Sequence, residues 1–137
     1  TAIAEDFEGR IWASSNSSGL MRYDESTREF LLVTSTTDHG IEDIFVEESG
    51  TLLYTSQGSV KAINTSTGRP IEWPSRAWEL SNLGEAHKIY GVQGAKHTFV
   101  FGSNGISRIS MTDRNILSVG WSDLLGALKL HNTHSLE

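Results

Sequence analysis

Gly9-Arg-Ile-Trp12, followed by a Ser- and Asn-rich turn and then by Gly19-Leu-Met-Arg-Tyr-Asp24, forms a unit that the chain repeats. The same order, an apolar run and then a glycine that opens a second apolar run, recurs about 41 residues later and again about 46 residues after that. The second copy is Gly50-Thr-Leu-Leu53 with Gly58-Ser-Val-Lys-Ala-Ile-Asn64, and the third is Lys96-His-Thr-Phe99 with Gly105-Ile-Ser-Arg-Ile-Ser110.

Each copy is predicted to contain four β-strands. Short apolar runs alternate with polar turn residues about every ten residues, which is typical of an antiparallel meander. Four strands in a repeat of roughly 40 to 50 residues are typical of one β-propeller blade. We therefore predict an all-β fold of about three four-stranded blades. The expected strands are residues 2–5, 10–14, 19–23 and 29–33, then 41–47, 51–55, 59–63 and 70–73, then 88–92, 98–101, 106–110 and 116–119.

The three blades are expected at about residues 1–36, 37–80 and 85–120. Large apolar residues at matching positions, such as Trp12 and Leu53, are predicted to pack between blades, because a single blade cannot bury both of its faces.

The tail, residues 121–137, has apolar residues at helical spacing. It is predicted to be either a short helix or the start of a further blade. Closed propellers typically have four to eight blades, so about three units do not close a ring. Two interpretations follow: the chain is a segment of a larger propeller, or several copies complete one ring. We favour the segment, and the expected partners are further blades or a second copy of the chain.

Composition excludes several classes of protein. The formal net charge is −6, and the 11 Lys and Arg residues are scattered among acids, so neither nucleic-acid binding nor membrane contact is expected. The longest apolar runs are far too short to span a bilayer. The chain has no cysteine, which excludes disulfides, thiolate nucleophiles and cysteine-ligated metals.

The first unit resembles a known repeat. Residues 3–14, Ile-Ala-Glu-Asp-Phe-Glu-Gly-Arg-Ile-Trp-Ala-Ser, with Gly19-Leu-Met-Arg-Tyr-Asp24, are similar to the two-component regulator propeller repeat, which has I-x-x-D-x-x-G-x-L-W and then G-L-x-x-Y/F-D. Leu53 and Phe99 stand where that repeat has Trp. The resemblance implies a sensor region of a hybrid two-component receptor, in a periplasmic or extracellular location. It also implies an oligosaccharide or other small ligand.

Two further resemblances leave alternatives open. Residues 62–73 are similar to a quinoprotein-type repeat, and the first unit is also similar to repeats of streptogramin-lyase and lactonase propellers. A non-catalytic, ligand-binding sensor segment is therefore our main hypothesis. A propeller enzyme of the lyase, lactonase or quinoprotein kind is the first alternative, and a scaffold for protein–protein interaction is the second. Repeat signatures report blade packing, and a fold does not determine a function.

Candidate ligand-binding residues lie where links and turns meet. His39 and His87 fall in links between blades, which come together on one face of a propeller. Asn16, Gln57 and Asn104 lie in turns between the second and third strands, which share that face and carry groups that hydrogen-bond a sugar.

An aromatic side chain and two acids complete the candidates. Trp78, in an irregular link, is the candidate for a ligand-facing aromatic residue. Asp6 and Glu47 occupy the same turn of two units, which favours hydrogen bonding to turn amides over acid–base catalysis. No catalytic motif and no paired histidine motif is present, so no catalytic residue, metal or cofactor is predicted.

Overall fold

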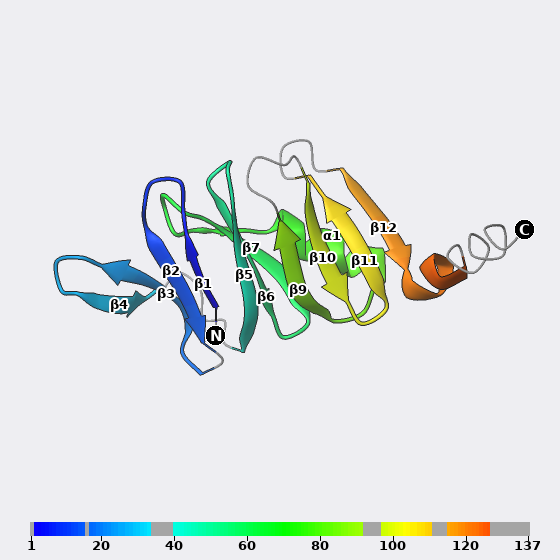
Figure 1. Ribbon diagram of the computed structural model, residues 1–137, viewed down its shortest axis with the longest axis horizontal. Coiled ribbons are helices and arrows are strands. Elements are labelled where there is room, and N and C mark those ends of the chain that lie inside the picture. The colour runs from blue at the N-terminus through cyan, green and yellow to red at the C-terminus, as the bar shows by residue number, and fades with distance from the viewer. Residues whose placement is uncertain (1, 16, 34–39, 92–96, 111–114, 127–137) are drawn as a thin grey trace, which may run out of the picture.

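The computed structural model describes residues 2–15, 17–33, 40–91, 97–110 and 115–126. Within these residues, twelve strands form three four-stranded antiparallel sheets that lie in a row (Figure 1). The predicted all-β fold of about three propeller blades is confirmed. Ten of the twelve strands match the expected bounds to within one residue at both ends. The fourth strand of the second unit ends two residues early, at Ile71, and the first strand of the third unit begins two residues early, at Ala86. His87 therefore lies in a strand and not in the expected link.

Each sheet contains four consecutive strands of the chain. Sheet A consists of β1 (Ala2–Glu5), β2 (Ile11–Ser15), β3 (Gly19–Asp24) and β4 (Glu29–Leu32). Sheet B consists of β5 (Ile41–Glu47), β6 (Thr51–Ser56), β7 (Ser59–Asn64) and β8 (Pro70–Ile71). Sheet C consists of β9 (Ala86–Gly91), β10 (Thr98–Gly102), β11 (Gly105–Ile109) and β12 (Ile116–Gly120).

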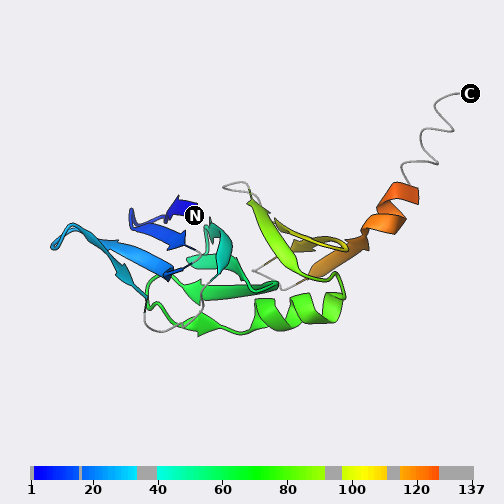
Figure 2. The ribbon, with the colours of Figure 1, turned by 90° about the horizontal axis from the view of Figure 1, so that it is seen from below.

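The sheets meet along their first strands. β1 contacts β5, and β5 contacts β9, so each sheet runs from an inner first strand to an outer fourth strand. This is the arrangement of neighbouring blades in a propeller. Figure 2 shows that the outer strands of sheet A and sheet C diverge from the middle sheet.

Sheet B is covered on both faces. All six residues of β6 are buried, and their side chains alternate between the two neighbouring sheets. Leu52 and Tyr54 belong to the core cluster shared with Trp12 and Leu20 of sheet A, whereas Leu53 belongs to the cluster shared with sheet C. Trp12 and Leu53 therefore pack between sheets, as the repeat predicted.

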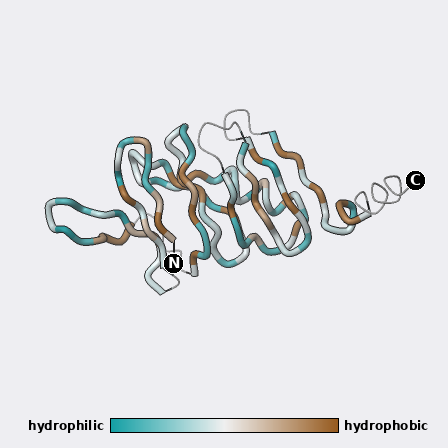
Figure 3. Tube along the Cα trace, in the orientation of Figure 1, coloured by the Kyte–Doolittle hydropathy of each residue, from teal (hydrophilic) through white to brown (hydrophobic). Residues whose placement is uncertain are grey.

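The outer faces of the two end sheets are apolar and uncovered. On sheet A, cross-strand pairing aligns Ile3, Ala13, Met21 and Leu32 in one row, in which Ile3 is 70 % exposed and Leu32 is 54 % exposed. On sheet C, the equivalent row contains Tyr90, Phe99, Arg108 and Leu117, so one cation lies among its exposed apolar side chains. Figure 3 shows that all three sheets contain hydrophobic segments.

A helix follows a shortened fourth strand in the second unit. β8 ends at Ile71, and α1 (Trp73–Ser81) begins two residues later, where an extended strand and an irregular link were expected. Pro74 in the first turn of the helix has a fixed φ that suits this position and lacks only an N–H that would be unpaired there. The helix ends at Ser81, and the residue that caps it, Asn82, has a φ of 59°. α1 packs against β7, and residues 121–126 of the tail are also helical.

Candidate functional site

One face of the molecule is built around the link between sheets B and C. We call it the loop face, and it consists of residues 82–87, the β6–β7 turn at Gln57 and Gly58, and the β10–β11 turn at Ser103 and Asn104. The backbone N–H of Ala86 donates to Gly58 O at 2.7 Å. On the other side, the Ser103 N–H donates to Glu85 O, and the Asn104 N–H donates to Leu83 O, both at 2.9 Å. The link is therefore held between the two turns.

Local sequence explains this close approach. Gln57 and Gly58 have φ values of 51° and 79°, which is the two-residue turn that suits the twist of a hairpin. Gly84 has a φ of 78°, and a side chain at this position would collide with the hydroxyl of Ser103. Glycine at position 84 thus permits the link to lie directly on the β10–β11 turn.

His87 lies at the edge of the loop face, next to sheet B. Its Nδ1 atom is 3.1 Å from Oε2 of Glu42, and both side chains are about half exposed. The backbone around it is held more firmly, because Thr55 Oγ1 donates to His87 O at 3.1 Å and the Ile89 N–H donates to Oδ2 of Asp43 at 2.9 Å. These contacts fix β9 against sheet B.

The loop face can hydrogen-bond a polar ligand. Gln57 and Asn104 supply amides, Ser103 a hydroxyl, His87 an imidazole and Glu85 a carboxylate, and all five side chains are exposed. These mixed hydrogen-bond donors and acceptors suit recognition of a polar ligand. Over the parts of the chain that the structure describes, no three His, Asp or Glu side chains form a group able to hold a metal ion.

The structure brings together three of the predicted ligand-binding residues, Gln57, His87 and Asn104, around one link. Asn16 and His39 lie outside the described residues. Trp78 is placed elsewhere: it belongs to α1, is 3 % exposed, and donates its indole N–H to Gly84 O at 2.9 Å. Its side chain fills the core between sheets B and C and does not face a ligand at this surface.

Glu42 and Glu85 were not among the predicted ligand-binding residues. Glu42 is the second residue of β5, and His87 is the second residue of β9. Because first strands of neighbouring blades lie side by side, these matching positions are a signal by which the pair could have been found. No comparable signal marks Glu85, which reaches the loop face only through the path of the link.

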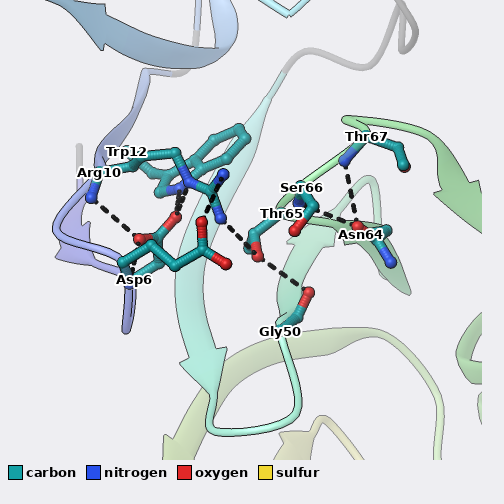
Figure 4. A network of polar contacts seen from close by, with 9 residues as sticks. Asp6, Arg10, Trp12, Gly50, Asn64, Thr65, Ser66 and Thr67 are labelled. Atoms are coloured by element: carbon teal, nitrogen blue, oxygen red, sulfur yellow. Dashed lines mark hydrogen bonds and ion pairs between the residues drawn. The ribbon is translucent and has the colours of Figure 1, made fainter.

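Asp6 organises a separate polar network, between sheets A and B (Figure 4). Its Oδ2 atom accepts hydrogen bonds from Trp12 Nε1 at 2.9 Å and Arg10 Nε at 2.6 Å, and its Oδ1 atom accepts from the Glu8 and Arg10 N–H groups. Arg10 Nη2 also reaches Thr65 Oγ1 of sheet B at 3.5 Å. Burial opposes ionisation of Asp6, but the hydrogen bonds from Trp12 and Arg10 outweigh it and lower the pKa of its carboxyl. This network supports the predicted structural role.

Glu47 holds the corresponding turn of sheet B. Its carbonyl accepts the Gly50 N–H at 3.1 Å, as the Asp6 carbonyl accepts the Gly9 N–H at 3.0 Å. The side chain of Glu47 differs from that of Asp6 in its pKa. Burial raises the pKa of Glu47, and this effect exceeds the opposite effect of the hydrogen bond that Thr98 Oγ1 donates at 2.6 Å. A hydroxyl of the next sheet is its main contact, so we assign Glu47 to packing between sheets B and C.

Comparisons with known proteins identify the fold. No family model matches the sequence, and no curated protein matches it. Solved structures of the extracellular domain of BT4673 from B. thetaiotaomicron do match. One, described as a one component system, has a TM-score of 0.61 at 20 % identity and covers 90 % of this chain. Another, described as a hybrid two component system, has a TM-score of 0.64 at 22 % identity and covers 88 %.

The likeness to BT4673 concerns the fold. The chain spans only 16 % of the length of each of these two structures. Its three sheets therefore correspond to part of a larger domain in each neighbour. No helix among residues 2–15, 17–33, 40–91, 97–110 and 115–126 is both long and apolar enough to cross a bilayer.

Proposed function

We propose that this chain is a non-catalytic, ligand-binding segment of a β-propeller sensor of the two-component type, in a periplasmic or extracellular location. The observation that carries the proposal is the loop face, where exposed polar side chains converge on a link held by backbone hydrogen bonds from both sides. The fold shared with the extracellular domain of BT4673 supports the same class of protein.

The ligand class that suits the loop face is an oligosaccharide fragment. The amides of Gln57 and Asn104 each offer donors and an acceptor, and the Ser103 hydroxyl offers both as well. Sugar hydroxyls are matched by such mixed groups. Backbone hydrogen bonds hold the link on both sides, and a surface positioned in this way reduces the entropy lost on binding.

Binding of oligosaccharides by calorimetry tests this proposal. Removing both amides, with Gln57→Gly and Asn104→Ala in one variant, should weaken binding about tenfold or more, since each lost hydrogen bond contributes roughly 0.5–1.5 kcal/mol. Glycine at position 57 keeps the positive φ available. Ser66→Ala, in an exposed turn outside the loop face, is the matched control. Equal binding by the double variant would reject the loop face, and no binding by the unmodified chain to any oligosaccharide tested would reject the proposed ligand.

We also propose that the uncovered outer faces of sheets A and C are contact surfaces for sheets of the same kind, from further blades or from a second copy. Two observations support this proposal: both end sheets carry exposed apolar side chains on their outer faces, and β6 of the middle sheet, which is covered on both faces, is completely buried. Light scattering on a sizing column distinguishes the two sources. A discrete dimer would favour a second copy, and an aggregating monomer would favour missing blades. A stable, fully soluble monomer would contradict both.

A further inference from the structure

A second recess lies away from the loop face, between the outer halves of sheets A and B. Its volume is about 580 Å³, and we call it the A/B groove. One wall is formed by β3 and β4, and the other by the β7–β8 turn. Its lining includes Arg10, Trp12, Arg22, Asp24, Leu31 and Val33.

Strand pairing places a cation and apolar side chains on the same wall. Trp12 pairs with Arg22, and Arg22 pairs with Leu31, so these three residues form one cross-strand row on the face of sheet A that is turned toward sheet B. Leu31 is 47 % exposed. The row therefore presents a positive charge above a buried indole, with an uncovered apolar side chain beside it.

The two arginines of the groove differ in whether an acidic side chain forms an ion pair with them. Arg10 forms ion pairs with Asp6 at 2.6 Å and Glu8 at 3.2 Å. The guanidinium of Arg22 lies 5.9 Å from the ring centroid of Trp12 and, among the described residues, forms no ion pair. Asp24, two residues along the strand, directs Oδ1 to the N–H and hydroxyl of Ser26 at 3.0 and 2.8 Å. Its carboxylate hydrogen-bonds within its own turn, and the nearby charge of Arg22 adds the smallest of the effects that lower its pKa, so the two side chains interact through space without forming an ion pair.

We propose that the A/B groove binds a small organic carboxylate with an apolar body. The guanidinium of Arg22 pairs with the carboxylate through two parallel hydrogen bonds, a geometry for which its planar fork is suited. Trp12 beneath it favours a fixed plane through a cation–π contact. The apolar body of the ligand lies on Leu31 and Val33. Both walls belong to this chain.

This site is independent of the proposed oligosaccharide-binding role of the loop face. We expect a dissociation constant on the order of 1 mM, because the groove is open, offers a single charged contact and accepts a ligand of only about eight heavy atoms. Such affinities are measured by nuclear magnetic resonance titration. The indole Nε1–H of Trp12, which donates to Asp6 directly beneath the row, is one of four tryptophan reporters in the chain.

The experiment compares 4-methylpentanoate with 4-methylpentanamide, which has the same shape and no charge. With 4-methylpentanoate we expect saturating chemical-shift changes at the backbone N–H groups of Arg22 and Leu31 and at the Trp12 indole. For 4-methylpentanamide we expect an affinity at least tenfold lower. Equal affinity for the two compounds, or no saturating shift with the acid, would overturn the proposal.

Variants assign the contact to Arg22. Arg22→Gln should lower the affinity for the acid at least tenfold, and Arg22→Lys should retain part of it, because lysine keeps the charge and loses the bidentate geometry. Arg108→Gln, an exposed arginine on the outer face of sheet C, is the matched control and should bind as the unmodified chain does. Undiminished binding by a folded Arg22→Gln variant would exclude the proposed contact.

Discussion

The two spaces between neighbouring sheets are closed in different ways. Between sheets A and B, a polar chain from Asp6 through Arg10 to Thr65 joins the sheets, and the outer part remains an open groove. Between sheets B and C, α1 supplies Trp78, which lies against Gly102 of β10. A side chain at Gly102 would meet the Trp78 ring at about 2.5 Å, so glycine makes the room for the indole. Repeated sheets therefore share a fold, and the inserted segment decides whether a space between them is filled.

The largest expected effect is the loss of the indole that fills the space between sheets B and C. Trp78→Ala should lower the free energy of unfolding by about 3–5 kcal/mol, because it leaves a cavity in the core. Urea denaturation followed by circular dichroism measures this change. Leu80→Ala on the same helix, where the side chain is 76 % exposed, should cost less than about 0.5 kcal/mol. Similar losses in the two variants would contradict the assignment of Trp78 to the core.

A smaller loss is expected in the polar contact between sheets A and B. Asp6→Ala removes the acceptor for the Trp12 indole, which is 1 % exposed, and for Arg10. Unsatisfied buried donors should cost about 1–3 kcal/mol. Hydrogen exchange should show faster exchange in β2 than in β10, since the second contact is untouched. Glu25→Ala, at an exposed position in the β3–β4 turn, serves as the control. Uniform loss of protection in all sheets would show that the two contacts are not separable.

The pH dependence of stability should differ in sign for Asp6 and Glu47. The pKa of Asp6 is lowered by folding, so its contribution is present above its unfolded value and is lost as the pH falls through its folded value, below about pH 4. The pKa of Glu47 is raised by burial, so its contribution is present below its unfolded value and is lost as the pH rises through its folded value.

Neutral variants separate these two contributions. Asp6→Asn should reduce the loss of stability at acidic pH. Glu47→Gln should remove the loss of stability that occurs as the pH rises, and should leave the free energy of unfolding near pH 7 unchanged or slightly higher. Urea unfolding from about pH 3 to 8 measures both. A steeper acid limb in Asp6→Asn, or a marked loss near pH 7 in Glu47→Gln, would contradict the assigned directions.

The smallest effect is expected at the exposed pair on the loop face. Glu42→Gln should change the free energy of unfolding by no more than about 0.5 kcal/mol, because both members of the Glu42–His87 pair are about half exposed and screened by solvent. A double-mutant cycle with His87→Ala at low and high salt measures the coupling. A coupling above about 1 kcal/mol that persists in high salt would show that the pair is a structural element of the loop face.

Much of the fold was predictable because the repeat has matched positions. Trp12 and Leu53 pack between sheets as expected, and the backbone carbonyls of Asp6 and Glu47 accept equivalent turn hydrogen bonds. The helix α1 was missed because the repeat favoured a strand up to residue 73 and gave no pattern for the residues after it, which were expected to form an irregular link. Pro74 and the spacing of Pro74, Ala77 and Trp78 suit a helix, and this pattern placed Trp78 in the core.

The candidate sites were less predictable than the fold. Gln57, His87 and Asn104 were expected on one face because blade topology brings their turns and links together, and the structure places them around one link. The A/B groove had no counterpart in the sequence analysis. It depends on which residues of β3 and β4 face sheet B, and on how far the β7–β8 turn lies from them.

The sequence by itself determined the local elements: turn glycines and apolar runs favour short strands, and their repetition predicts stacked sheets. The tertiary structure alone decided what fills the spaces between the sheets. Strand periodicity reports which side chains are apolar, but packing between two diverging sheets depends on distances that no local pattern encodes. Thus one space encloses Trp78, and the other leaves Arg22 exposed above Trp12.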